Sequence, residues 1–129
     1  MNKQIQIVLV LYKTALNDSL SYKSLVEHIK HITINYELLI YNNSAEQIIT
    51  HDNDCTVVNS SSNAMLAGAY NYGLKIATET DKDWILLLDQ DTELTKEYFS
   101  ELENFLCTES NQHFAAAVLR DFCLQSAGY

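Results

Sequence analysis

The stretch Trp84-Ile85-Leu86-Leu87-Leu88-Asp89-Gln90-Asp91-Thr92 passes directly from five apolar residues to acidic and polar ones. A near-continuous apolar run of this length is typical of a strand that helices cover on both faces, as in a parallel sheet. In open α/β sheets, ligands bind beyond the carboxyl ends of the strands. The stretch therefore predicts a buried parallel strand, with a ligand site around Asp89 and Asp91.

The residues before this stretch alternate between strand and helix patterns. Residues 5–11 form a second apolar run and predict a central parallel strand. The start of a helix follows, where Asn17, Asp18 and Ser19 offer side-chain acceptors and Leu25, Val26, Ile29 and Ile32 recur at helical spacing. Strands are expected at residues 36–41 and 55–58, with a weaker helical stretch at residues 45–49 between them.

Two more helices flank the quoted stretch. The first is predicted by apolar and small residues at helical spacing, namely Leu66, Tyr70, Gly73, Leu74 and Ala77. The second is expected after Thr95, a suitable cap, and its apolar positions are Tyr98, Phe99, Leu102, Phe105 and Leu106. Residues 114–119 predict a last strand, and residues 120–129 show no pattern. This order predicts an α/β fold with a mainly parallel sheet flanked by helices.

Composition and length restrict the class of protein. The chain has 129 residues and no proline, which indicates one domain without a linker. Its apolar runs are far shorter than the roughly 20 residues that span a bilayer, and its three cysteines lack a pairing pattern, so a cytoplasmic chain is expected. The formal net charge of -9 argues against a nucleic-acid partner.

Asp89 and Asp91 together suggest a metal site. Mg²⁺ and Mn²⁺ prefer oxygen ligands and commonly take one or two carboxylates, while phosphates and water complete the shell. A diphosphate would be the natural third partner. Taken alone, however, two acids after a strand usually face solvent or cap the next helix, so the neighbouring motifs have to decide.

Three motifs in order carry a family resemblance: Tyr41-Asn42-Asn43-Ser44, then residues 63–73 (NAMLAGAYNYG), then Leu87-Leu88-Asp89-Gln90-Asp91-Thr92. Together they resemble the family 2 glycosyltransferases of the GT-A fold, in particular the bacterial rhamnosyltransferase-like branch. The resemblance covers roughly residues 5–106. It implies the Rossmann-like, nucleotide-sugar-binding half of that fold.

The resemblance implies an inverting, metal-dependent hexosyltransferase that uses Mn²⁺ or Mg²⁺. It would transfer a sugar from a dTDP- or UDP-sugar to a glycan or lipid-linked acceptor in polysaccharide biosynthesis, at the inner face of the cytoplasmic membrane. The implied roles are base contact for Leu11, Tyr12 and Asn42, the nucleotide pocket for Asn63 and Asn71, ribose or metal for Asp89, and metal for Asp91.

Some features depart from the family pattern. Met65 stands where relatives commonly have Gly, and Asn42 replaces a frequent Asp. Relatives also continue for about a hundred residues with the acceptor-binding half and the general base, a role that no residue here can be assigned. We therefore expect residues 1–129 to be a single, truncated donor-binding domain.

Two alternatives follow from these departures. The first is a non-catalytic fragment that binds a nucleotide or covers an apolar face by forming a homodimer. The second is a receiver-like, flavodoxin-like or dinucleotide-binding domain. Tyr12-Lys13-Thr14 disfavours this second class, because a receiver needs acids after its first strand and a dinucleotide-binding domain needs a glycine-rich turn there.

Overall fold

The computed structural model describes residues 3–31, 33–50, 54–60, 62–107, 116–119 and 122–126, the last two segments as backbone only. In these residues the chain forms a six-stranded sheet with the strand order β3-β2-β1-β4-β6-β5. The strands are β1 (Gln4–Leu11), β2 (Asn35–Asn42), β3 (Cys55–Asn59), β4 (Trp84–Leu88), β5 (Ala116–Leu119) and β6 (Phe122–Ser126).

The four strands β3, β2, β1 and β4 run parallel to one another, and β6 and β5 add an antiparallel pair beside β4. The parallel strands therefore end at one edge of the sheet, at Asn59, Asn42, Leu11 and Leu88. The chain moves outward from β1 to β2 and β3, then crosses back to place β4 on the other side of β1. Such a reversal of strand order leaves a crevice at the carboxyl ends, where ligands bind in α/β folds.

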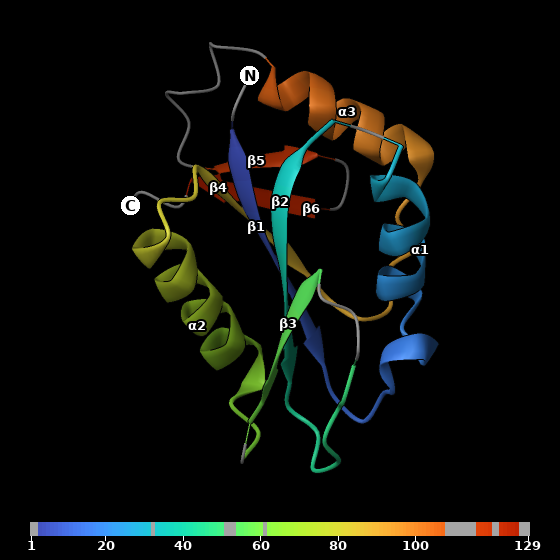
Figure 1. Cartoon of the computed structure of the whole chain (residues 1–129), viewed down its shortest axis with the longest axis vertical. Coiled ribbons are helices and arrows are strands. Elements are labelled where there is room, and N and C mark those ends of the chain that lie inside the picture. Colours follow the sequence, from blue (N-terminus) through green and yellow to red (C-terminus); the bar gives the residue numbers. More distant parts are fainter. Residues whose placement is uncertain are drawn as a thin grey trace.

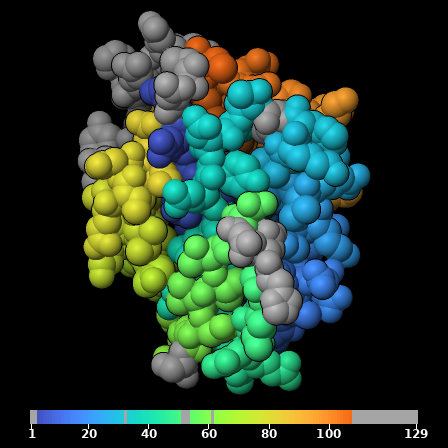
Figure 2. Space-filling model, in the orientation of Figure 1, coloured from blue at the N-terminus to red at the C-terminus, as the bar shows by residue number. Residues whose placement is uncertain are grey.

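Helices cover both faces of the sheet (Figure 1). α1 (Leu20–Ile29) and α3 (Lys96–Leu106) pack on one face, and α2 (Met65–Glu79) packs on the other. Figure 2 shows α2 and α1 on opposite flanks of the molecule, with β2 and β3 between them. The expected α/β fold with a mainly parallel sheet flanked by helices is confirmed.

The central strand β1 divides its side chains between two cores. Ile5, Ile7, Leu9 and Leu11 pack toward α1 and α3, while Val8 and Val10 pack toward α2. This alternation follows from the two-residue repeat of a strand. All six side chains are buried, which explains why Gln6 is the one polar residue between Ile5 and Leu11.

Side-chain caps define where two helices begin. The Ser19 hydroxyl accepts a hydrogen bond from the Tyr22 amide at 3.2 Å, and the Thr95 hydroxyl accepts one from the Tyr98 amide at 3.1 Å. Each cap satisfies an amide at the start of its helix that has no partner within the helix. The expected cap at Thr95 is confirmed, and the structure selects Ser19 from the three candidates before α1.

Inside α3, burial raises the pKa of the Tyr98 hydroxyl.

Two expectations about local structure are wrong. Residues 45–49 form no helix, because Asn42 and Asn59 side chains bond the backbone of Glu46 and Ile48 and hold the segment as a loop. The tail, expected to lack a pattern, contains β6, which lies antiparallel between β4 and β5.

Ile32 and Phe114 lie outside the described residues, and Leu66 is 52% exposed despite its helical spacing.

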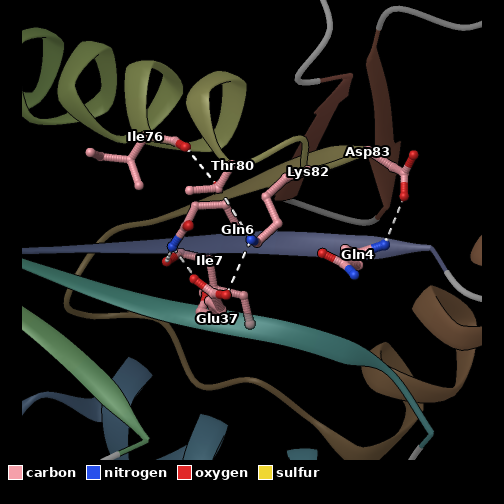
Figure 3. Close-up of polar contacts among 8 residues, drawn as sticks. All are labelled: Gln4, Gln6, Ile7, Glu37, Ile76, Thr80, Lys82 and Asp83. Carbon is pink, nitrogen blue, oxygen red and sulfur yellow. Dashed lines mark hydrogen bonds and ion pairs between the residues drawn. The ribbon is translucent and has the colours of Figure 1, made fainter.

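Polar contacts fasten the amino end of the sheet, away from the crevice (Figure 3). The Lys82 ammonium group is 3.2 Å from the Glu37 carboxylate, and the Lys82 side chain is only 4% exposed. The Gln4 amide donates to the Asp83 carboxylate at 2.9 Å, and the Asp83 amide donates back to the Gln4 carbonyl at 2.9 Å. These contacts join β1, β2 and the turn before β4.

Candidate functional site

Loops at the carboxyl edge of the sheet enclose a cleft of about 800 Å³. One wall is the segment after β1, residues 12–17, and the other is the loop after β2, residues 42–50. Tyr22, Ser60, Ser62 and Asn63 complete the lining. A volume of this size is typical of sites for small molecules and cofactors. Three of the residues expected to bind the nucleotide, Tyr12, Asn42 and Asn63, line this cleft.

The side chain of Asn42 is fully buried and already hydrogen-bonded. Its Nδ2 donates to the Glu46 carbonyl at 2.8 Å and to Asn59 Oδ1 at 2.9 Å, and its Oδ1 accepts from the Ser44 amide at 3.0 Å. Within the described residues, this amide therefore serves to shape the loop that forms the outer wall of the cleft.

Tyr12 and Lys13 form the inner wall. The Tyr12 side chain is 44% exposed, and the Lys13 ammonium group lies 5.2 Å from the centre of its ring. The Lys13 amide donates to the Ser44 hydroxyl at 2.6 Å, which joins the two walls. Lys13 is the one basic side chain among the lining residues in the described part of the chain. The cleft thus combines an exposed aromatic ring with a cation.

Asp89 and Asp91 follow β4 and are both exposed. They do not line the cleft, but Gln90 between them bonds the backbone of Tyr12, so the segment of residues 89–92, here called the carboxylate loop, adjoins the inner wall. The Thr92 hydroxyl donates to Asp89 Oδ1 at 2.6 Å. Neither carboxylate forms an ion pair with any described residue, which leaves both charges available to a cation.

The carboxylate loop fits a hard divalent cation that shares its coordination with a ligand. Among the described residues, no group of three or more His, Cys, Asp or Glu side chains could hold a metal. Two aspartates supply only oxygen atoms, as Mg²⁺ and Mn²⁺ prefer, and these ions often complete their shells with phosphate and water. The donor set fits a metal–diphosphate complex better than a metal bound by protein alone.

The other two residues expected to bind the nucleotide, Leu11 and Asn71, do not line the cleft. The Leu11 side chain is fully buried, and its carbonyl accepts a hydrogen bond from the Asn43 amide at 2.8 Å. Asn71 is exposed on α2. Burial and, second, the negative charge of Asp89 raise the pKa of Tyr70, the neighbour of Asn71. In the sequence, Tyr70 stands out only as part of the motif at residues 63–73 and by its helical spacing, so no separate role was predicted for it.

The start of α2 contains a strained residue. Met65 has a φ of 61°, in the left-handed region, and its side chain is 67% exposed. Glycine adopts this conformation without steric cost, which gives a physical reason for the glycine that the family resemblance places here. The substitution of methionine costs backbone strain at the edge of the site.

We expect Met65→Gly to raise the free energy of unfolding by up to about 1 kcal/mol, because relief of left-handed strain outweighs the greater freedom of glycine in the unfolded chain. Urea unfolding followed by circular dichroism would measure the change. Met65→Ala is the control, because alanine keeps the strain and should give no gain. Equal stabilisation by both substitutions would contradict the explanation.

The order 3-2-1-4 of the parallel strands, with helices on both faces and acids after β4, defines a Rossmann-like fold of the GT-A type. The chain belongs to glycosyl transferase family 2, whose model matches residues 21–124. The crystal structure of S. aureus TarS 1-349 is similar, with a TM-score of 0.53 and 13% sequence identity.

That match covers 80% of this chain and 32% of the TarS chain, so the present chain spans about a third of its length. At this identity the likeness shows the fold alone. A search of curated proteins finds no match. Family and fold therefore rest on the family model and on the structural likeness together.

Proposed function

We propose that this chain forms the donor site of a family 2 glycosyltransferase and binds a nucleoside diphosphate sugar together with Mn²⁺ or Mg²⁺. The observation that carries the proposal is the placement of two unpaired, exposed carboxylates beside a cleft of about 800 Å³, joined to it through Tyr12. The family match supports the same assignment.

In this proposal, different residues contact different parts of the donor. The exposed Tyr12 ring offers a face on which a base can stack. Asp89 and Asp91 would hold the metal, which when bound stabilises the negative charge of the departing diphosphate. The Lys13 ammonium group adds a positive charge on the cleft side. The chain carries a formal net charge of -9, so an anionic ligand needs local positive charges, such as the metal and Lys13, in order to bind.

The proposed reaction is displacement at the anomeric carbon with inversion, and it needs a base to deprotonate the acceptor hydroxyl. We assign that base to none of the described residues. From the resemblance we take the donor to be a dTDP- or UDP-sugar and the acceptor to be a glycan or lipid-linked saccharide in bacterial polysaccharide assembly, at the inner face of the cytoplasmic membrane. No helix in the described segments has the length and apolar character to span a bilayer.

The test is calorimetric titration of the chain with UDP and with dTDP, with and without Mn²⁺. Asp91→Asn is expected to weaken metal-dependent binding about tenfold or more, because one of two metal carboxylates is lost, and to leave metal-free binding unchanged. The matched control Glu79→Gln removes one negative charge at the exposed end of α2 and should bind like the wild type.

Two results would reject this function. Absence of binding by the wild type at millimolar nucleotide would show that the chain has no donor site. If such a chain also associated with itself, the dimerising fragment would be the better explanation. Equal loss of binding in Asp91→Asn and Glu79→Gln would show that overall charge, rather than the carboxylate loop, controls affinity.

A further inference from the structure

The side chain of Gln90 pairs with both main-chain groups of Tyr12. The Tyr12 amide donates to Gln90 Oε1 at 2.8 Å, and Gln90 Nε2 donates to the Tyr12 carbonyl at 3.2 Å. A carboxamide offers one acceptor and two donors on the same planar group, so it can satisfy a residue at the end of a strand as a neighbouring strand would. The pairing thus bridges the ends of β1 and β4.

The backbone of Gln90 is fixed from the opposite side by α1. The Gln90 carbonyl accepts from the Ser19 hydroxyl at 2.8 Å and from the Ser21 amide at 3.3 Å. Two further bonds follow along the chain, from the Thr92 amide to the Ser21 hydroxyl at 2.9 Å and from the Leu94 amide to the Ser24 hydroxyl at 2.8 Å. The three serines are buried.

The two sets of contacts hold the carboxylate loop at its middle residue. Asp89 and Asp91 flank Gln90 and are exposed. Apart from the bond from Thr92 to Asp89, neither carboxylate forms a hydrogen bond or ion pair with a described residue. Gln90 and the bond from the Thr92 amide to the Ser21 hydroxyl therefore hold the backbone on both sides of Asp91, and the Gln90 side chain also holds Tyr12, which carries the aromatic ring of the cleft.

We propose that Gln90 is a positioning residue that couples the metal side of the donor site to its nucleotide side. This inference rests on the proposed function. Metal and nucleoside diphosphate bound together raise each other's affinity by one coupling factor, which is the same in both directions. Gln90 keeps the carboxylates and Tyr12 in the one arrangement in which a single diphosphate nucleotide reaches both. Its loss lowers the coupling factor more than it lowers metal-free nucleotide binding.

The experiment measures the coupling factor as the ratio of the UDP dissociation constants without and with saturating Mn²⁺. Wild type, Gln90→Glu and Gln90→Met are compared. Glutamate keeps the shape but has no donor for the Tyr12 carbonyl, and methionine keeps the volume but forms neither bond. Gln4→Glu is the matched control, since it makes the same change on an exposed residue at the amino end of β1, away from the cleft.

Gln90→Met is expected to lower the coupling factor about tenfold, the loss that two neutral hydrogen bonds can produce, and Gln90→Glu, which keeps the bond from the Tyr12 amide, is expected to lower it about threefold. Metal-free UDP binding is expected to change less than about twofold in both variants. Circular dichroism gives the folded fraction, to which all titrations are normalised. An unchanged coupling factor in the variants, or an equal loss of metal-free and metal-dependent binding, would overturn the role of Gln90. Absence of metal-dependent binding in the wild type would instead overturn the proposed function itself.

Discussion

Gly73→Ala is expected to lower the free energy of unfolding by up to about 2 kcal/mol, although alanine is the better helix former. A Cβ atom at position 73 would lie 2.4 Å from one methyl carbon of Val8 and 3.2 Å from the other. Val8 is fully buried on the central strand and its branched side chain is stiff, so it cannot move aside easily. Overpacking of about 1–3 kcal/mol then exceeds the helix-propensity gain of about 1 kcal/mol.

Urea unfolding of Gly73→Ala, of Val8→Ala and of the double variant would measure this contact. We expect the double variant to be clearly more stable than the sum of the two single effects, because the new methyl group enters the space that Val8 vacates. Asn71→Ala, at an exposed position of the same helix, is the control and should be neutral or slightly stabilising. Additive effects in the double variant would show that α2 and β1 are not in close contact at Gly73.

Asn43→Ala is expected to cost about 2–3 kcal/mol of unfolding free energy. The Asn43 side chain is 5% exposed, its Oδ1 accepts from the Ala64 amide at 3.0 Å, and its Nδ2 donates to the Met65 carbonyl at 3.2 Å. Removal of the carboxamide leaves two partly buried backbone groups without these partners, each worth about 1 kcal/mol or more. The same substitution should weaken nucleotide binding, because Asn43 fastens the start of α2 to the loop after β2.

Asn63→Ala is the matched control for Asn43→Ala. Asn63 is exposed, and its Oδ1 accepts one hydrogen bond, from the Met65 amide at 2.8 Å. A single solvent-accessible bond of this kind is worth about 1 kcal/mol or less, so the control should retain most of the stability. Thermal and urea unfolding of both variants would measure the two losses of stability. Equal losses would contradict the role assigned to the burial of Asn43.

The elements that sequence analysis predicted well are those with a strong local signal. The near-continuous apolar runs of β1 and β4 required cover on both faces, and the structure supplies it with α2 on one side and α1 and α3 on the other. The loop at residues 45–49 was mistaken for a helix because its apolar residues lie at helical spacing. Its actual conformation depends on Asn42 and Asn59, which come from the ends of other strands.

The candidate site could be predicted only in part, for a related reason. Acids after a buried strand follow from residue type and position, so the sequence indicated them, whereas the role of Tyr12 was implied only by the family resemblance. The contacts of Gln90 with Tyr12 and with Ser19 join residues 78 and 71 positions apart, and no local pattern records them. The effect of Asp89 on Tyr70 likewise arises only when α2 packs beside β4.

The bridge between Tyr12 and Gln90 also makes the Tyr12 amide hydrogen a natural probe of whether the site is assembled. Its acceptor comes from a segment 78 residues away, so any local opening that separates the end of β4 from β1 exposes that hydrogen to solvent. Exchange with deuterium at this one amide follows the opening of that edge of the sheet, even while the rest of β1 stays paired with β2. The carboxylate loop and the aromatic ring of Tyr12 consequently come apart in the same opening, and slow exchange at the Tyr12 amide marks a chain in which both are in place.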